Sequence, residues 1–142
     1  SKIIEVILPN SIQIIQDTAF WGCQNLISVV IPSSVTSIGT RAFYDCGSLT
    51  SITIPESVTS IGYDAFSRCN LTSVTIDSSY AYQKAGADYD TCGYLLQNPD
   101  TVYVKANLVE DTSLTASSYL ASNFNRSGTA NEDGYYIYTR NA

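Results

Sequence analysis

The chain has 142 residues, of which 44% are hydrophobic and only 14% charged, and its formal net charge is −6. This length is typical of one domain that buries a hydrophobic core. The acidic balance, with seven Lys and Arg residues in all, argues against nucleic-acid binding, because phosphate recognition needs clustered cations. No run of about 18 apolar residues is present, so the sequence predicts no membrane span.

One stretch, Leu49–Cys69, recurs along the chain and sets its organisation. It occurs almost unchanged at Leu26–Cys46, more loosely at Ile3–Cys23, and in a decayed form from Leu71 onward. A repeat of about 23 residues is typical of a stacked architecture, in which each unit buries its apolar edge against the next. The pattern therefore predicts a solenoid.

Each unit opens with a predicted strand. In the second copy, Val29 and Ile31 alternate with Ser28 and Val30, and a period of two indicates a strand. Pro32 then ends the strand, because proline has no N–H for a hydrogen-bond ladder. Stacking of the units would align these strands as a parallel sheet.

The second half of each unit has a different pattern. Ile38 belongs to another apolar column, and Gly39 marks a tight turn. Ala42 and Phe43 then predict a short helical or 3₁₀ segment, and Cys46 closes the unit. Strand and helical segment together predict an α/β repeat solenoid with short parallel strands.

The repeat fails gradually toward the C-terminus. After Ile76, Asp77 stands where the earlier units carry proline. Thr101–Lys105 restores the alternating pattern and predicts a last strand. Since terminal repeats must cover an exposed core, we divide the single domain into repeats over 1–105 and a C-terminal cap over 106–142.

The predicted cap has three parts. Thr112 or Ser113 is a suitable helix cap, and we expect a helix from there to about Phe124. The stretch Asn125–Asp133 reads as a polar loop, and Gly134–Thr139 as a closing strand.

The stretch LTSITIPESVTSIGYDAFSRC resembles the consensus of the BspA-type leucine-rich repeats, found in surface proteins of oral and gut bacteria and of parasitic protists. The resemblance covers residues 3 to about 76 and rests on the Leu, Ile, Ile-Pro, Val, Ile-Gly, Ala-Phe and Cys positions. It implies a right-handed leucine-rich-repeat coil. It also implies a cell-surface or secreted protein that adheres to host proteins or partner cells, and it carries no residue-level motif to transfer.

Cysteines close four successive units, at Cys23, Cys46, Cys69 and Cys92. On successive rungs their sulfurs would lie in a line, too extended for one zinc ion to gather. The rung spacing permits a disulfide between neighbours, but equivalent side chains point the same way. We interpret them as a column of free, buried thiols, with a disulfide or a metal as alternatives and with Cys92 as the most divergent.

Catalytic groups are scarce. The chain has no histidine, the usual general base and metal ligand, and no G-x-S-x-G motif, so we predict a non-enzymatic protein without cofactor or metal. The acidic pairs Asp88 with Asp90 and Glu132 with Asp133 read as solvated turns. Asn131–Gly134 reads as an ordinary turn, with a weak calcium site as the alternative.

The outward side chains of the predicted strands form the candidate binding surface. Solenoids bind partners on such extended faces, and hydroxyl groups beside exposed apolar residues suit a protein ligand. The predicted face consists of Glu5, Ile7, Ser28, Val30, Ser51, Thr53, Ser73, Thr75 and Tyr103.

Two alternative functions stay open, a glycan-binding module and a structural spacer. Most of the eleven tyrosines follow residue 79, and aromatic rings are good contact anchors. The same rings would also serve to plug the solenoid end. The tyrosines concerned are Tyr80, Tyr82, Tyr103, Tyr135, Tyr136 and Tyr138.

Self-association is a further expectation. No capping segment precedes Ile3, so we expect an open N-terminal rung that offers strand groups and core to a second copy.

Overall fold

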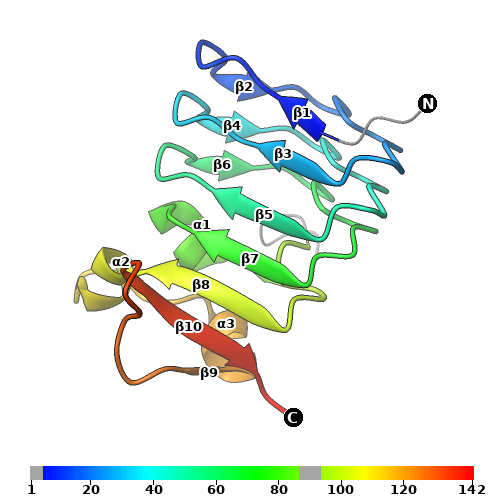
Figure 1. The fold of residues 1–142 in the computed structure, drawn as a ribbon. Helices are drawn as coiled ribbons and strands as arrows, with labels where there is room; N and C mark the ends of the chain where they lie inside the picture. The colour runs from blue at the N-terminus through cyan, green and yellow to red at the C-terminus, as the bar shows by residue number, and fades with distance from the viewer. Residues whose placement is uncertain (1–4, 87–93) are drawn as a thin grey trace.

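The computed structural model describes residues 5–86 and 94–142, and its repeats stack as successive rungs of a solenoid from β1 at the N-terminal end to β8, followed by β10 and then β9 (Figure 1). The strands are β1 (Glu5–Ile7), β2 (Ile14–Ile15), β3 (Ser28–Val30), β4 (Ser37–Ile38), β5 (Ser51–Ile54), β6 (Ser60–Ile61), β7 (Ser73–Ile76), β8 (Thr101–Lys105), β9 (Phe124–Arg126) and β10 (Tyr135–Arg140). The helices are α1 (Ser79–Lys84), α2 (Ala106–Glu110) and α3 (Ser118–Asn123).

The strands that open the rungs lie side by side along one face (Figure 1). β1 pairs in parallel with β3, while β7 pairs in parallel with both β5 and β8. The register keeps equivalent residues in columns, with Ile52 beside Val74 and Val74 beside Val102. All three of these side chains are buried, whereas their neighbours along the strands face outward. The predicted strands and their alternation are confirmed.

A second column of strands, β2, β4 and β6, forms a three-stranded parallel sheet that the sequence pattern did not predict. Each strand has two residues, and their apolar members Ile15, Ile38 and Ile61 pair in register and are buried. A strand of two residues contributes a single buried residue per repeat. One residue shows no alternation, so the sequence pattern cannot distinguish such a strand from a turn.

The Ala-Phe segments are turns and not the helical or 3₁₀ segments expected from the sequence. The Phe43 N–H donates to the Ala65 carbonyl of the next rung at 2.9 Å, so it is not available for a helical bond. Arg41, two residues before Phe43, has a left-handed backbone (φ 53°), which also interrupts a right-handed helix. The short helices of the fold lie further along the chain, and the predicted solenoid of stacked parallel strands is confirmed.

A column of phenylalanines runs through the core on the turn side. The ring of Phe43 stacks on Phe20 with centroids 5.1 Å apart and on Phe66 with centroids 5.4 Å apart. The rings are nearly parallel, with interplanar angles of 7° and 5°. Repetition of one residue at one position thus produces continuous packing across three rungs.

The cysteine column beside these rings consists of free thiols. Cys46 and Cys69 are buried and Cys23 is half-buried, and none of the three forms a disulfide. The Cys46 thiol donates to the Phe20 carbonyl at 3.1 Å, and the Cys69 thiol bonds the equivalent carbonyl one rung on. The hydrogen bond between the Cys69 and Cys46 thiols, together with burial, raises the pKa of the Cys69 thiol well above its ordinary value. The predicted free thiols are confirmed for these three and their burial for Cys46 and Cys69, while Cys92 lies outside the described residues.

The C-terminal segment packs on the last parallel rung. β10 pairs antiparallel with β8, and β9 pairs antiparallel with β10, which extends the face of the solenoid (Figure 1). The predicted closing strand is therefore confirmed as β10. The predicted polar loop is wrong at its start, because Asn125 pairs with Thr139 within β9 and β10. None of the described helices is long and apolar enough to cross a membrane.

The predicted helix starting at Thr112 or Ser113 begins later, at Ser118. The Asp111 carboxylate accepts bonds from the Ser113 N–H and hydroxyl, at 2.9 and 2.6 Å, and holds this stretch as a turn. Ser117 is the actual cap, since its hydroxyl accepts from the Leu120 N–H at 3.1 Å. Short-range side-chain bonds thus hold the predicted cap Ser113 in a turn and place the actual cap four residues later. At the other end, residue 124 already belongs to β9.

Candidate binding surface

The predicted strand face is formed by two neighbouring sheets, β1 with β3 and β5 with β7 and β8, which lie along the same side of the solenoid (Figure 1). The register places Ile7 beside Val30, and it aligns Thr53, Thr75 and Tyr103 across β5, β7 and β8. Each predicted residue is exposed or half-buried, whereas the residues between them point into the core. The residues on this face are Glu5, Ile7, Ser28, Val30, Ser51, Thr53, Ser73, Thr75 and Tyr103.

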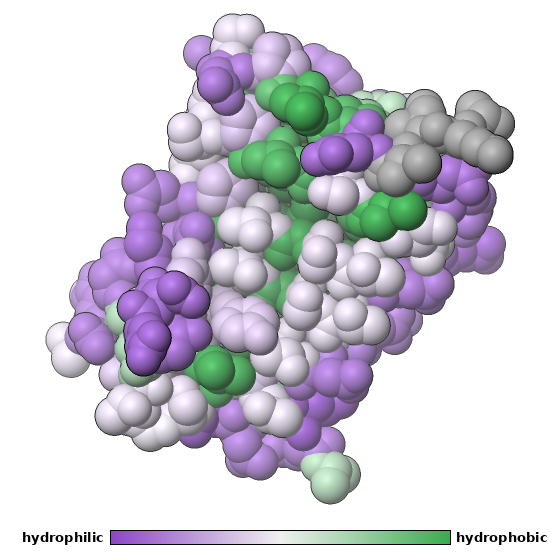
Figure 2. All heavy atoms as spheres, viewed as in Figure 1, coloured by the Kyte–Doolittle hydropathy of each residue, from purple (hydrophilic) through white to green (hydrophobic). Residues whose placement is uncertain are grey.

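The strand face is apolar at its N-terminal end. Ile7 is 80% exposed and Val30 is 60% exposed, and hydrophobic side chains gather over β1 and β3 in Figure 2. Below them the face is paler, as hydroxyl residues such as Thr53 and Thr75 follow. Exposed apolar residues beside hydroxyl groups form a graded surface with few charges.

The strand face is longer than the sequence predicted, because β10 continues it. Ile137 lies opposite Tyr103, and Tyr135 lies opposite Lys105. Both β10 side chains are half-buried. Burial and then a hydrogen bond with the Asp77 carboxylate raise the pKa of Tyr135 above its ordinary value. Sequence reasoning missed these residues because the antiparallel register of a returning strand is set by tertiary pairing.

The six C-terminal tyrosines do not form an exposed patch. Tyr82 and Tyr138 are buried in the core, and burial raises the pKa of Tyr138 well above its usual range. Tyr136 is half-buried and donates its hydroxyl to Glu110 at 3.1 Å. Tyr80, Tyr103 and Tyr135 are half-buried as well. This packing favours the interpretation that these rings close the solenoid end.

The Asn131–Gly134 stretch is a turn held by its own amide side chain. The Asn131 side-chain oxygen accepts from the N–H groups of Asp133 and Tyr135, at 3.1 and 2.9 Å. Among the residues that the structure describes, no three His, Cys, Asp or Glu side chains cluster to hold a metal ion. The pair Asp88 and Asp90 lies outside the described residues.

Comparison with known proteins finds that the chain is similar to leucine-rich repeat proteins. The model of the BspA-type leucine-rich repeat region, built on six copies, matches residues 1–92. The crystal structure of a leucine-rich repeat protein from T. pallidum is 36% identical over 54% of this chain, with a TM-score of 0.49. The match spans 35% of that protein. No curated protein sequence shows a significant match.

Proposed function

Because this chain belongs to the BspA-type leucine-rich repeat family, we propose that it is a non-enzymatic recognition module of a cell-surface or secreted protein. Members of this family are protein-interaction scaffolds, commonly on bacterial surfaces. Its proposed role is adhesion to host proteins or to partner cells. The strand face would be the contact surface, since its stacked strands offer an extended area on a rigid frame.

The observation that carries the proposal is the apolar end of the strand face. Ile7 and Val30 are large side chains, 80% and 60% exposed, on adjacent strands held in register. Such neighbouring apolar side chains lose unfavourable contact with water when a partner covers them. The hydroxyl residues that follow offer donors and acceptors at the rim, the usual division of a protein interface.

We expect Val30→Lys combined with Thr53→Lys to abolish binding to a protein ligand. Each lysine would bring an unpaired ammonium group into a desolvated contact, which typically costs 2 to 5 kcal/mol, or about thirtyfold or more in affinity. Both positions face solvent in the free protein, so the melting temperature should stay within about 2 °C. Binding is measured on immobilised matrix and plasma proteins by surface plasmon resonance.

A charge-matched control is Ala121→Lys with Thr129→Lys, which adds the same charge at two exposed positions of the C-terminal segment. This control should bind as the unmodified protein does. Full binding by the Val30 and Thr53 variant would refute the strand face as the contact surface.

We also propose self-association through the N-terminal rung. Ile12 and Phe20 are half-buried, whereas their equivalents one rung on, Val35 and Phe43, are fully buried. Among the described residues, β1 has a strand neighbour on one side only. A half-buried apolar rung, whose strand β1 is unpaired on one edge within residues 5–86, is complementary to the same rung of a second copy.

Sedimentation velocity should therefore show a concentration-dependent dimer, and Leu8→Glu should shift it toward monomer. Leu8 is half-buried in the first rung, so a carboxylate there disfavours contact more than folding. Ala121→Glu is the control and should not shift the equilibrium. A single monomeric species up to high micromolar concentration contradicts the proposal.

A further inference from the structure

A second surface lies on the turns, away from the strand face, and carries aromatic rings around one arginine. The Arg41 guanidinium carbon lies 5.5 Å from the Trp21 ring, 5.6 Å from Tyr44 and 5.5 Å from Tyr63. Trp21 and Tyr44 also contact each other, with centroids 5.0 Å apart and planes at 47°. We name this set the turn-face cluster, which consists of Trp21, Arg41, Tyr44, Tyr63, Asp64 and Arg68.

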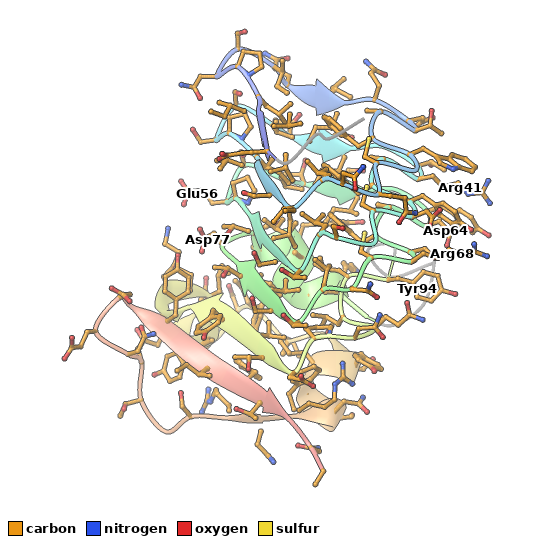
Figure 3. The ribbon with its side chains drawn as sticks, turned by 45° about the vertical axis from the view of Figure 1, so that its right-hand side comes forward. Arg41, Glu56, Asp64, Arg68, Asp77 and Tyr94 are labelled. Atoms are coloured by element: carbon orange, nitrogen blue, oxygen red, sulfur yellow. The ribbon has the colours of Figure 1, made fainter. Side chains whose placement is uncertain are left out.

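Polar contacts hold the cluster in place. The Arg41 guanidinium forms an ion pair with Asp64 one rung on, at 3.4 Å. The backbone N–H of Arg41 donates to the Tyr63 carbonyl at 2.8 Å. Arg68 lies over the other side of the cluster, 5.6 Å from the Tyr44 ring. Figure 3 shows Arg41, Asp64 and Arg68 following one another along one side of the solenoid. The rings are therefore positioned before any ligand arrives.

The backbone of these turns is strained at the same positions. Arg41, Asp64 and Arg68 all have left-handed backbones, with φ of 53°, 57° and 61°. A non-glycine residue in this region costs about 1 kcal/mol or more, since its Cβ crowds the backbone. The equivalent of Arg68 in the first copy is a glycine, Gly22, so the repeat accepts the unstrained residue there. Thr18 and Asp45 have left-handed backbones at the equivalent positions of other rungs, so this conformation belongs to the turn of each of the first three repeats.

The outer parts of the rings remain open to solvent. Trp21 is 48% exposed and Tyr63 is 44% exposed, and within the described part of the chain no other aromatic side chain is exposed to this extent. Arg41 already occupies the space between the rings, which excludes a cationic ligand from it. The two arginines on these turns stand beside three carboxylates, Asp17, Asp45 and Asp64, so the surface carries no excess of positive charge that would attract polyanions.

We propose that the turn-face cluster binds a neutral, β-linked glycan chain. A sugar ring with equatorial substituents presents a flat C–H face that packs on an aromatic ring, and its hydroxyls bond to neighbouring charged groups. Trp21 and Tyr44 contact each other, with centroids 5.0 Å apart and planes at 47°, so the ring surface left for a sugar is the exposed outer part of Trp21 and Tyr63. Arg68 and Asp45 flank Tyr44 and offer hydrogen-bond donors and acceptors to the hydroxyls. This site is separate from the proposed protein-binding strand face.

The test uses Trp21, the single tryptophan of the chain, as a reporter inside the site. Titration with cellohexaose and with N-acetylchitohexaose should change its fluorescence saturably for at least one of the two. Tyr44→Ala and Tyr63→Ala should each weaken that binding by about threefold to tenfold, the usual worth of a ring contact. The cap variant with Ala121→Lys and Thr129→Lys should bind as the unmodified protein does.

Three results would overturn the proposal. One is the absence of a saturable signal with both probes. Another is unchanged affinity in both tyrosine variants while circular dichroism shows them folded. The last is tighter binding of a heparin-derived hexasaccharide than of the neutral probes, which would identify the ligand as an anion. Calorimetry of Trp21→Phe, which keeps an aromatic face, should still show binding and so separates ring packing from a fluorescence artefact.

Discussion

Phe43→Ala is expected to lower the free energy of unfolding by about 3 to 5 kcal/mol, the range for a large ring removed from a tight core. The Phe43 side chain is fully buried between two parallel rings, 5.1 Å from Phe20 and 5.4 Å from Phe66. Its N–H is also bonded to the next rung, so the backbone cannot easily move in to fill the cavity. Urea unfolding followed by circular dichroism measures the change.

The chain contains its own matched control for this variant. Phe20 holds the same position one rung earlier, but it is half-buried and, among the residues that the structure describes, stacks on Phe43 alone. We expect Phe20→Ala to cost about 1 to 3 kcal/mol, since less apolar area is lost and water already reaches the site. Equal costs for the two variants would contradict the view that stacking across rungs stabilises this core.

Arg140→Ala is expected to destabilise the fold by about 2 to 4 kcal/mol. The guanidinium donates to the carbonyls of Pro99 and Leu96, at 2.9 and 3.1 Å, and to the Tyr119 hydroxyl at 3.2 Å. These carbonyls belong to buried residues that would lose a charged donor. We propose that residues 106–142 cap the repeats, and this arginine fastens the proposed cap to the last rung. Thermal unfolding measures the loss.

Two further variants, one at Arg140 and one at Arg126, separate the effect of charge from that of the hydrogen-bond geometry. Arg140→Lys keeps the charge but loses the planar fork that reaches several acceptors, so we expect most of the loss to remain. Arg126→Ala removes an exposed arginine that lies 5.1 Å from the Tyr136 ring, and should cost about 0.5 to 1 kcal/mol. A similar cost for Arg126→Ala and Arg140→Ala would show that the carbonyl network is not what matters.

Features encoded within one repeat could be predicted well. The alternation around Val29 and Ile31 and the proline after it identified the strand, its buried side and its end. The same alternation identified the outward residues, and Val30 and Thr53 face solvent as expected. These features depend on the period of the side chains and on the chemistry of proline, which do not require knowledge of distant residues.

Features that depend on competition between alternatives could not be predicted. The sequence predicted Thr112 or Ser113 as the helix cap, but the Asp111 carboxylate accepts the N–H of Ser113, and the helix begins at Ser118 with Ser117 as its cap. The Ala-Phe turns are not helical because their N–H groups bond to the next rung, as that of Phe43 does. In each case, the backbone N–H donates to an acceptor that the local pattern does not reveal, a nearby carboxylate or a carbonyl of the next rung.

The two surfaces show the same division. The sequence by itself determined the strand face, since one column of outward residues repeats at a constant period. Only the tertiary structure decided the turn-face cluster, because Trp21, Arg41 and Tyr63 occupy three different positions of three different repeats. Stacking of the rungs brings these three residues into contact. Arg41 has a left-handed backbone there, which its residue type does not predict. A periodic feature is visible in one dimension, whereas a contact between unlike positions exists only once the rungs are stacked.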